Sequence, residues 1–89
     1  MDSAKVSDGM FEIMFVIGAL QKKTGAPPSR KDVAKEIGKT PQCVSGYVSR
    51  LVLRSLVEAI GRFQGVRLTE AGSKYLRTRL EWEKSRLAS

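Results

Sequence analysis

Residues 40–50 read TPQCVSGYVSR, and this stretch sets two kinds of residue on opposite sides of one helix. Val44, Val48 and Leu51 are spaced by four and three residues, which predicts a helix that packs one apolar stripe against a core. The opposite side would carry charged residues if it were an ordinary solvated surface. Instead it carries small, uncharged residues that stabilise a helix poorly. These residues are Gln42, Ser45, Gly46 and Ser49.

The residues before this helix predict a second helix joined to it by a very tight turn. Thr40 suits the N-cap of the later helix, and Pro41 suits its first position, where the missing N–H costs nothing. The segment SRKD at 29–32 has the form of a capping box at the start of a helix over residues 30–37. Because only residues 38–40 separate the two helices, the spacing is typical of a helix-turn-helix.

The rest of the chain predicts two flanking helices and a β-hairpin. Residues 8–23 are apolar on most sides of a helix, residues 57–68 contain two short strand-like runs around a turn, and Thr69 caps a last helix. We therefore expect an α+β, mostly α fold: one winged helix-turn-helix domain over residues 1–89. Its elements are helices at 8–23, 30–37, 41–54 (the recognition helix) and 70–87, and the wing hairpin at 57–68.

Two segments resemble known DNA-binding families. Residues 25–34, GAPPSRKDVA, resemble the start of the winged helix in LexA-type repressors, which follow the pattern G-x-P-P-[ST]-x-x-[DE]-[IV]-A. Residues 56–72, which end in LTEAG, look like the wing and following helix of MarR-, PadR- and DtxR-type regulators. The resemblance implies a superfamily that mainly binds DNA. It does not extend to a LexA protease domain, to the metal ligands of the DtxR kind or to a MarR ligand pocket.

Charge and composition limit the possible partners. The chain has 89 residues and a net charge of +7, and residues 21–55 hold eight basic against two acidic residues. A polyanion is therefore the expected partner, and a soluble basic surface without a specific partner is the alternative. One cysteine and no histidine exclude an internal disulfide framework and a Cys/His zinc site. The longest apolar run, residues 13–20, is too short for a bilayer, and no signal peptide is visible. We expect a cytoplasmic, nucleoid-associated protein without cofactor, metal or membrane partner.

The outward face of the recognition helix is the candidate surface for base contacts. A helix that enters the major groove needs small side chains, so that its axis can approach the bases, and a few amide, hydroxyl or guanidinium groups. Gln42 can pair with adenine, Arg50 with a guanine or a phosphate, and Gly46 lets the backbone come close. The alternative is a surface helix without a special role. The predicted base-contacting residues are Gln42, Ser45, Gly46, Ser49 and Arg50.

A second group of residues is predicted to contact the DNA backbone. Basic side chains on or beside the first helix of the motif suit phosphates, and helix starts can offer N–H groups to them. On the hairpin, arginine is attracted to the negative potential of the minor groove, although plain solvated polar residues are the alternative there. Tyr47 lies at the border of the core, where packing competes with phosphate contact. The predicted set is Ser29, Arg30, Lys31, Lys35, Lys39, Thr40, Tyr47, Arg54, Arg62, Gln64 and Arg67.

The apolar first helix also raises the question of a dimer. A chain of this size can hardly cover such a helix completely, so either a second subunit covers part of it or the helix is central within its own chain. A two-fold dimer would present two recognition helices about one DNA turn apart. Leu53, which projects opposite the core, has no firm explanation beyond helix fraying or a subunit contact. The predicted dimerisation residues are Phe11, Met14, Phe15, Leu76, Leu80, Trp82 and Leu87.

Three functions remain open at this stage, and an enzyme is not among them. The sequence shows no nucleophile–base pair, no glycine-rich phosphate loop and no metal ligand set. The leading hypothesis is a dimeric protein that binds double-stranded DNA as a site-specific transcriptional regulator. The first alternative is a DNA-coating architectural protein or partition adaptor that spreads along DNA from a specific site. The second is a winged helix used for protein–protein contacts.

Overall fold

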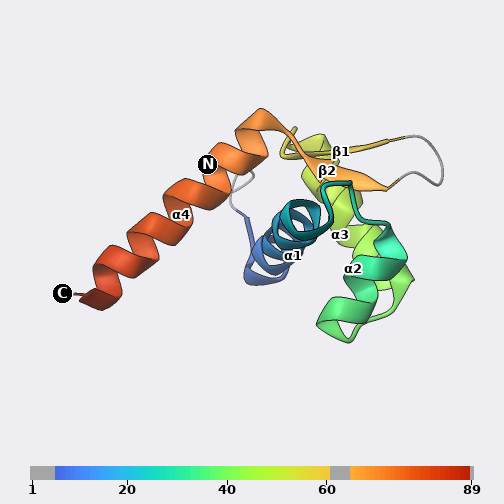
Figure 1. Ribbon diagram of the computed structural model, residues 1–89, viewed down its shortest axis with the longest axis horizontal. Coiled ribbons are helices and arrows are strands. Elements are labelled where there is room, and N and C mark those ends of the chain that lie inside the picture. Colours follow the sequence, from blue (N-terminus) through green and yellow to red (C-terminus); the bar gives the residue numbers. More distant parts are fainter. Residues whose placement is uncertain (1–5, 61–64, 89) are drawn as a thin grey trace.

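The computed structural model describes residues 6–60 and 65–88, with side chains as far as residue 85. Within these ranges the chain is mostly helical, with four helices and a two-stranded antiparallel sheet (Figure 1). This arrangement agrees with the expected α+β winged-helix fold. The elements in order are α1 (Asp8–Thr24), α2 (Arg30–Ile37), α3 (Pro41–Leu53), β1 (Val57–Ala59), β2 (Val66–Leu68) and α4 (Glu70–Ala88).

Short-range side-chain bonds set the starts of α2 and α3. The Ser29 hydroxyl oxygen accepts from the N–H of Asp32 at 3.0 Å, and the Asp32 carboxylate accepts from the N–H of Ser29, so the predicted capping box is confirmed. The Thr40 hydroxyl oxygen likewise accepts from the N–H of Cys43 at 3.2 Å. Helix α2 ends at Gly38, whose left-handed φ of 70° reverses the chain within the tight turn before α3.

The core is built around α1, which packs against α2, α3, β2 and α4. Ile13, Met14 and Ile17 of α1 have no exposed surface. The chain therefore buries this helix largely by itself, which is the second of the two possibilities left open above, and Met14 offers no surface to a second subunit. The other fully buried large side chains come from α2, α3 and the sheet: Val33, Val44, Val48, Leu51, Val57 and Val66.

The hairpin strands pair in antiparallel register, with Val57 opposite Leu68 and Ala59 opposite Val66. The N–H of Val66 also donates to the carbonyl of Pro28 at 2.8 Å, which ties the loop before α2 to the outer edge of β2. The strands therefore fix the hairpin beside the helix-turn-helix. The predicted turn between them lies outside the described residues.

Helix α4 leaves the end of β2 and extends away from the rest of the molecule, on the side opposite α2 (Figure 1). Arg79 fastens it to the start of α1. The Arg79 guanidinium lies 4.2 Å from the centroid of the Phe11 ring and donates to the Val6 carbonyl at 3.5 Å and to Asp8 Oδ1 at 3.3 Å. Within the described residues, no helix combines the length and apolar character needed to cross a membrane.

Candidate nucleic-acid interface

The outward face of α3 is open and carries no charged residue along its centre. Gln42, Gly46 and Ser49 are exposed, and they follow one another at the four- and three-residue spacing of a single helical stripe. A Cβ placed on Gly46 would meet no atom within 4 Å outside the helix backbone. Ser45 is half-buried and Arg50 is exposed, so both flank this stripe. The five residues predicted to contact bases therefore lie on or beside one accessible face.

Tyr47 packs beside the core and supports the edge of this face. Its ring is half-buried, and its hydroxyl is close enough to α1 that a Cβ on Gly9 would lie 2.7 Å from the oxygen. The Arg50 guanidinium lies 5.9 Å from the centroid of the Tyr47 ring, at the outer limit of a cation–π contact. Packing, the alternative to phosphate contact, therefore describes the position of Tyr47 in this structure.

Arg54 closes the C-terminal end of α3. Its Nη1 donates to the Arg50 carbonyl at 3.1 Å, which satisfies one of the carbonyls that a helix end leaves open. Its Nε is buried without a hydrogen-bond partner in the described part of the chain. Arg54 was predicted to contact the DNA backbone. In this structure its Nη1 is engaged by the end of its own helix, and the DNA contact stays a prediction.

The basic side chains of the helix-turn-helix are accessible. Lys31, Lys35 and Lys39 are exposed, and Arg30 is half-buried. Lys31 and Lys35 are four residues apart and therefore share one side of α2. The hydroxyl oxygens of the two capping residues each accept a helix N–H, as described above, which leaves the O–H proton of each available to donate to an anion. This side of the motif offers several groups suited to phosphates.

On the hairpin, the described arginine is already paired with a carboxylate. Arg67 lies directly opposite Glu58 in the strand pairing, and its Nε donates to Glu58 Oε1. The carboxylate therefore already compensates the charge of Arg67. The other two predicted wing residues, Arg62 and Gln64, lie outside the described residues.

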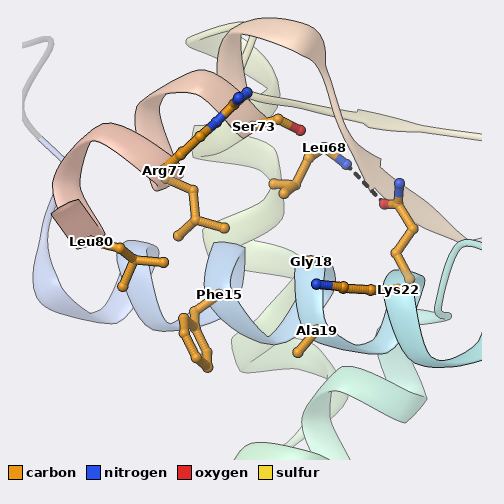
Figure 2. Close-up of a pocket in the computed structure, with 10 residues that line it drawn as sticks. Phe15, Gly18, Ala19, Lys22, Leu68, Ser73, Arg77 and Leu80 are labelled. Atoms are coloured by element: carbon orange, nitrogen blue, oxygen red, sulfur yellow. Dashed lines mark hydrogen bonds between the residues drawn. The ribbon is translucent and has the colours of Figure 1, made fainter.

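A groove between α1 and α4 carries most of the exposed apolar residues predicted for a dimer. It has a volume of about 540 Å³ and is lined by Leu68 of β2 together with residues of both helices. Phe15 of α1 and Leu80 of α4 lie at one end, and Lys22 lies at the other (Figure 2). Phe15 is 46% exposed, and Leu80 is also exposed. Trp82 is exposed too, but it lies outside this groove, in a second hollow that Tyr75 and Arg79 help to line.

The remaining residues predicted for the dimer have other surroundings. Leu76 is half-buried and lines the groove between α1 and α4. Phe11 lies beneath Arg79. Leu87 belongs to the last turn of α4, whose side chains the structure does not describe. Of the predicted set, Phe15, Leu76 and Leu80 therefore lie at the groove, Phe11 and Met14 pack within the chain, and Trp82 lies outside the groove.

Sequence reasoning missed the importance of Arg79 and of Gly72. Arg79 contacts residues more than 70 positions away, and no pattern in the sequence around it indicates these contacts. Gly72 lies against the Leu56 backbone so closely that an added Cβ would be 1.8 Å from the Leu56 oxygen. The LTEAG segment contained this glycine, and its position just inside a helix start was the available signal for a close approach.

No family model matches the chain. The chain is similar to the LexA repressor of Bordetella petrii, with 29% identity over 72 residues, which is 79% of this chain and 32% of that protein. It therefore spans about a third of the length of this relative. The similarity is weak, and it agrees with the resemblance of residues 25–34 to the start of a LexA-type winged helix.

Proposed function

We propose that the chain is a double-stranded DNA-binding protein that recognises a specific site through α3 and regulates transcription as a dimer. One observation carries this proposal: α3 presents an exposed, small and uncharged stripe beside the exposed lysines of α2. A solvated helix has no need of such a stripe, whereas a helix in the major groove does. The weak similarity to a repressor supports the same function.

In the proposed complex, α3 lies in the major groove with Gln42 and Ser49 facing base edges. Gln42 would pair with an adenine, and the absence of a side chain at Gly46 would let the helix axis come close to the base pairs. Arg50, steadied by the Tyr47 ring, would reach a guanine or a phosphate at the side of the groove. Direct hydrogen bonds of this kind give sequence preference.

Phosphate contacts in this proposal come from α2 and from the start of α3. Lys31, Lys35 and Lys39 provide charge, and the hydroxyls of Ser29 and Thr40 can donate at the two helix starts. These contacts orient the protein on the duplex but do not distinguish sequences. The proposal also keeps Arg30 and the wing residues Arg62, Gln64 and Arg67 as backbone contacts, with Arg67 dependent on release from Glu58.

The dimer in this proposal forms through the groove between α1 and α4. Phe15 and Leu80 expose apolar surface there, Trp82 exposes apolar surface outside the groove, and α4 extends away from the rest of the molecule (Figure 1). A chain that recognises one half-site alone would bind weakly at physiological salt, so a two-fold pair of recognition helices would raise the affinity. Met14 has no place in this interface because it is buried.

The function is tested by selecting a site from random-sequence duplexes, footprinting it, and measuring binding of variants to the selected and to random DNA. Gln42→Ala should weaken binding to the selected site by about 1–3 kcal/mol and leave binding to random DNA unchanged. Lys35→Ala should weaken both equally and reduce the salt slope by roughly one unit. Lys74→Ala, which removes an exposed lysine of α4, is the control for charge and should have little effect.

The same titration separates the competing functions. A regulator should protect one discrete two-fold site, and a DNA-coating protein should protect a length that grows with protein concentration. A protein–protein module should bind no duplex even at low salt. Equal losses of Gln42→Ala on selected and random DNA would contradict the role of α3 in base recognition.

A further inference from the structure

Leu53 is the most exposed large apolar side chain among the described residues, with 84% of its surface accessible. Exposing a leucine to this degree forgoes most of the stabilisation that its burial would provide. The side chain does not belong to the dimer groove, whose lining comes from α1, β2 and α4. Its position at the last residue of α3 therefore calls for another explanation.

The position of Leu53 on the helix supplies that explanation. Gln42, Gly46, Ser49 and Leu53 are separated by four, three and four residues, so all four lie on one stripe opposite the buried side of α3. Leu53 thus continues the proposed base-contacting face of α3 toward the C-terminal end of the helix. No charged side chain interrupts this stripe.

The end of α3 also leaves Leu53 uncovered. Arg54, the next residue, folds back to donate to the Arg50 carbonyl. Ser55 then takes a left-handed φ of 60°, which turns the chain away toward β1. Neither residue therefore covers Leu53, which stays exposed at the tip of the helix.

The distances suit a contact at the outer end of a half-site. Eleven residues of helix cover roughly 16 Å, which is about half of one DNA turn. Because the groove curves away from a straight helix, the last turn of α3 would lie farther from the base edges than Gly46 does, so a base contact there requires a long side chain. The group that an apolar side chain recognises in the major groove is the 5-methyl group of thymine, and a leucine is long enough to reach it.

We propose that Leu53 is a specificity-determining residue that contacts the 5-methyl group of a thymine at the outer end of each half-site. This inference rests on the proposed function, because it requires α3 to lie in the major groove. The contact removes one methyl group and the leucine side chain from water together. Each methyl group buried in this way should contribute about fourfold in affinity.

The test uses the selected duplex and replaces each thymine in turn by deoxyuridine, which removes only the methyl group. For the full-length wild-type chain, one replacement near the outer end of each half-site should weaken binding about fourfold. Leu53→Ala removes the contact in both half-sites of the dimer and should weaken binding to the unmodified duplex about 16-fold, as deoxyuridine at both positions does, and the deoxyuridine replacements should then cost nothing more. The variant should fold normally because the side chain is exposed.

Val52→Ala is the matched control, since it shortens a neighbouring, partly exposed apolar side chain on the flank of the stripe. It should keep the full sensitivity to deoxyuridine. The inference is overturned if Leu53→Ala binds as wild type does, or if it keeps the deoxyuridine sensitivity. It is also overturned if Leu53→Ala binds a single site normally and loses only the extension of the footprint with concentration, because Leu53 would then contact a neighbouring copy.

The result also separates this inference from the proposed function. If Gln42→Ala weakens binding to the selected site alone while the effect of no thymine methyl group depends on Leu53, the function stands and the role of Leu53 falls. If no duplex sequence can be selected at all, both fall together.

Discussion

The helix-turn-helix and the C-terminal helix are held in place by contacts of very different range. In the first, the capping bonds of Ser29 and Thr40 each reach three residues along the chain. Around α4, the bonds span 14 residues from Thr69 to Ser55, 47 from Leu68 to Gln21 and 73 from Arg79 to Val6. The helix starts of the first region are set by neighbours in sequence, whereas the position of α4 on the rest of the chain is set mainly by tertiary contacts.

This difference has a consequence for the two surfaces of the molecule. The proposed DNA-binding face belongs to a helix whose ends are fixed locally, so it should keep its shape when distant parts are changed. The groove between α1 and α4 depends on how α4 is fastened to the rest, so distant substitutions should alter it. Stability and dimerisation should therefore respond most strongly to changes around α4, and DNA recognition to changes on α3.

The largest loss of stability is expected for Gly72→Ala. The added Cβ would lie 1.8 Å from the Leu56 oxygen, and because that atom belongs to the backbone, α4 or β1 has to move. We expect a loss of about 2–4 kcal/mol in the free energy of unfolding, measured by urea denaturation. Ala71→Ser at the preceding exposed position is the control and should change stability by less than about 1 kcal/mol. A Gly72→Ala variant as stable as wild type would contradict the close approach.

Arg79→Met should come next and should loosen α4 from α1. The change removes the guanidinium from the Phe11 ring and from the Val6 carbonyl, at a cost of about 1–2 kcal/mol. Hydrogen exchange should rise at the first turn of α1, including the Met10 amide. Arg77→Met on the same helix is the control, since that arginine is exposed. Unchanged exchange at the start of α1 would show that Arg79 does not fasten the two helices.

The effect of Arg79 should not depend on pH in the neutral range. Burial of the guanidinium lowers the pKa of Arg79, but its interactions with Tyr75, Asp8 and Glu83 outweigh this and raise the pKa above the ordinary value on balance. A cation whose pKa is raised on folding contributes its stability fully below its unfolded pKa and loses that contribution only as the pH rises through the folded pKa. The difference between wild type and Arg79→Met should therefore stay constant near neutrality.

Two capping residues give a direct test of contact range. Ser29→Ala removes a cap that acts only within α2, and we expect a loss of about 1 kcal/mol. Thr69→Ala removes a cap as well, because the Thr69 oxygen accepts from the Gly72 N–H, and it also removes the bond from the Thr69 hydroxyl to the Ser55 carbonyl. It should cost about 1 kcal/mol more than Ser29→Ala. Thr69→Ser should restore most of the loss in urea denaturation, and failure of this rescue would assign the effect to the lost methyl group.

The same contrast explains which parts of the fold could be predicted from the sequence. The capping box at Ser29 and the tight turn at Gly38 are signals within a few residues, and periodicity placed Val44, Val48 and Leu51 on the buried side of α3. Whether Met14 is buried by its own chain or by a second subunit stayed open, because the answer depends on how four other elements pack around α1. The contact of Arg79 with Phe11 could not be predicted from the sequence either, because it also depends on how α4 packs against α1.

For the candidate site, the sequence could predict the outward face of α3. It could not predict which arginine side chains are already engaged by other groups of the chain. The stripe through Gln42, Gly46 and Ser49 follows from helical spacing alone. Whether an arginine is available depends on its partners, and Arg54 turns back onto the helix while Arg67 pairs with Glu58. A charge count treats these arginines like the exposed lysines of α2, although their surroundings differ.

The smallest change in stability is expected for Gly46→Ala, and its sign is opposite to that of the other substitutions. Nothing outside the helix backbone lies within 4 Å of the added Cβ, and alanine favours a helix over glycine, so stability should rise by about 0.5–1 kcal/mol. If α3 approaches base edges at this position, the same methyl group should weaken binding to the selected duplex by roughly 1–3 kcal/mol, as overpacking of a close contact does.

Ser85→Ala provides the control for this last prediction, because it also places alanine at an exposed helical position, far along α4. It should raise stability slightly and leave DNA binding unchanged. If Gly46→Ala is more stable and yet binds DNA less well, the loss of affinity cannot come from a poorly formed helix. It would then come from the methyl group that the substitution places against the DNA. If Gly46→Ala binds DNA as tightly as wild type, the helix does not approach the bases at Gly46, and the glycine serves no purpose at a DNA interface.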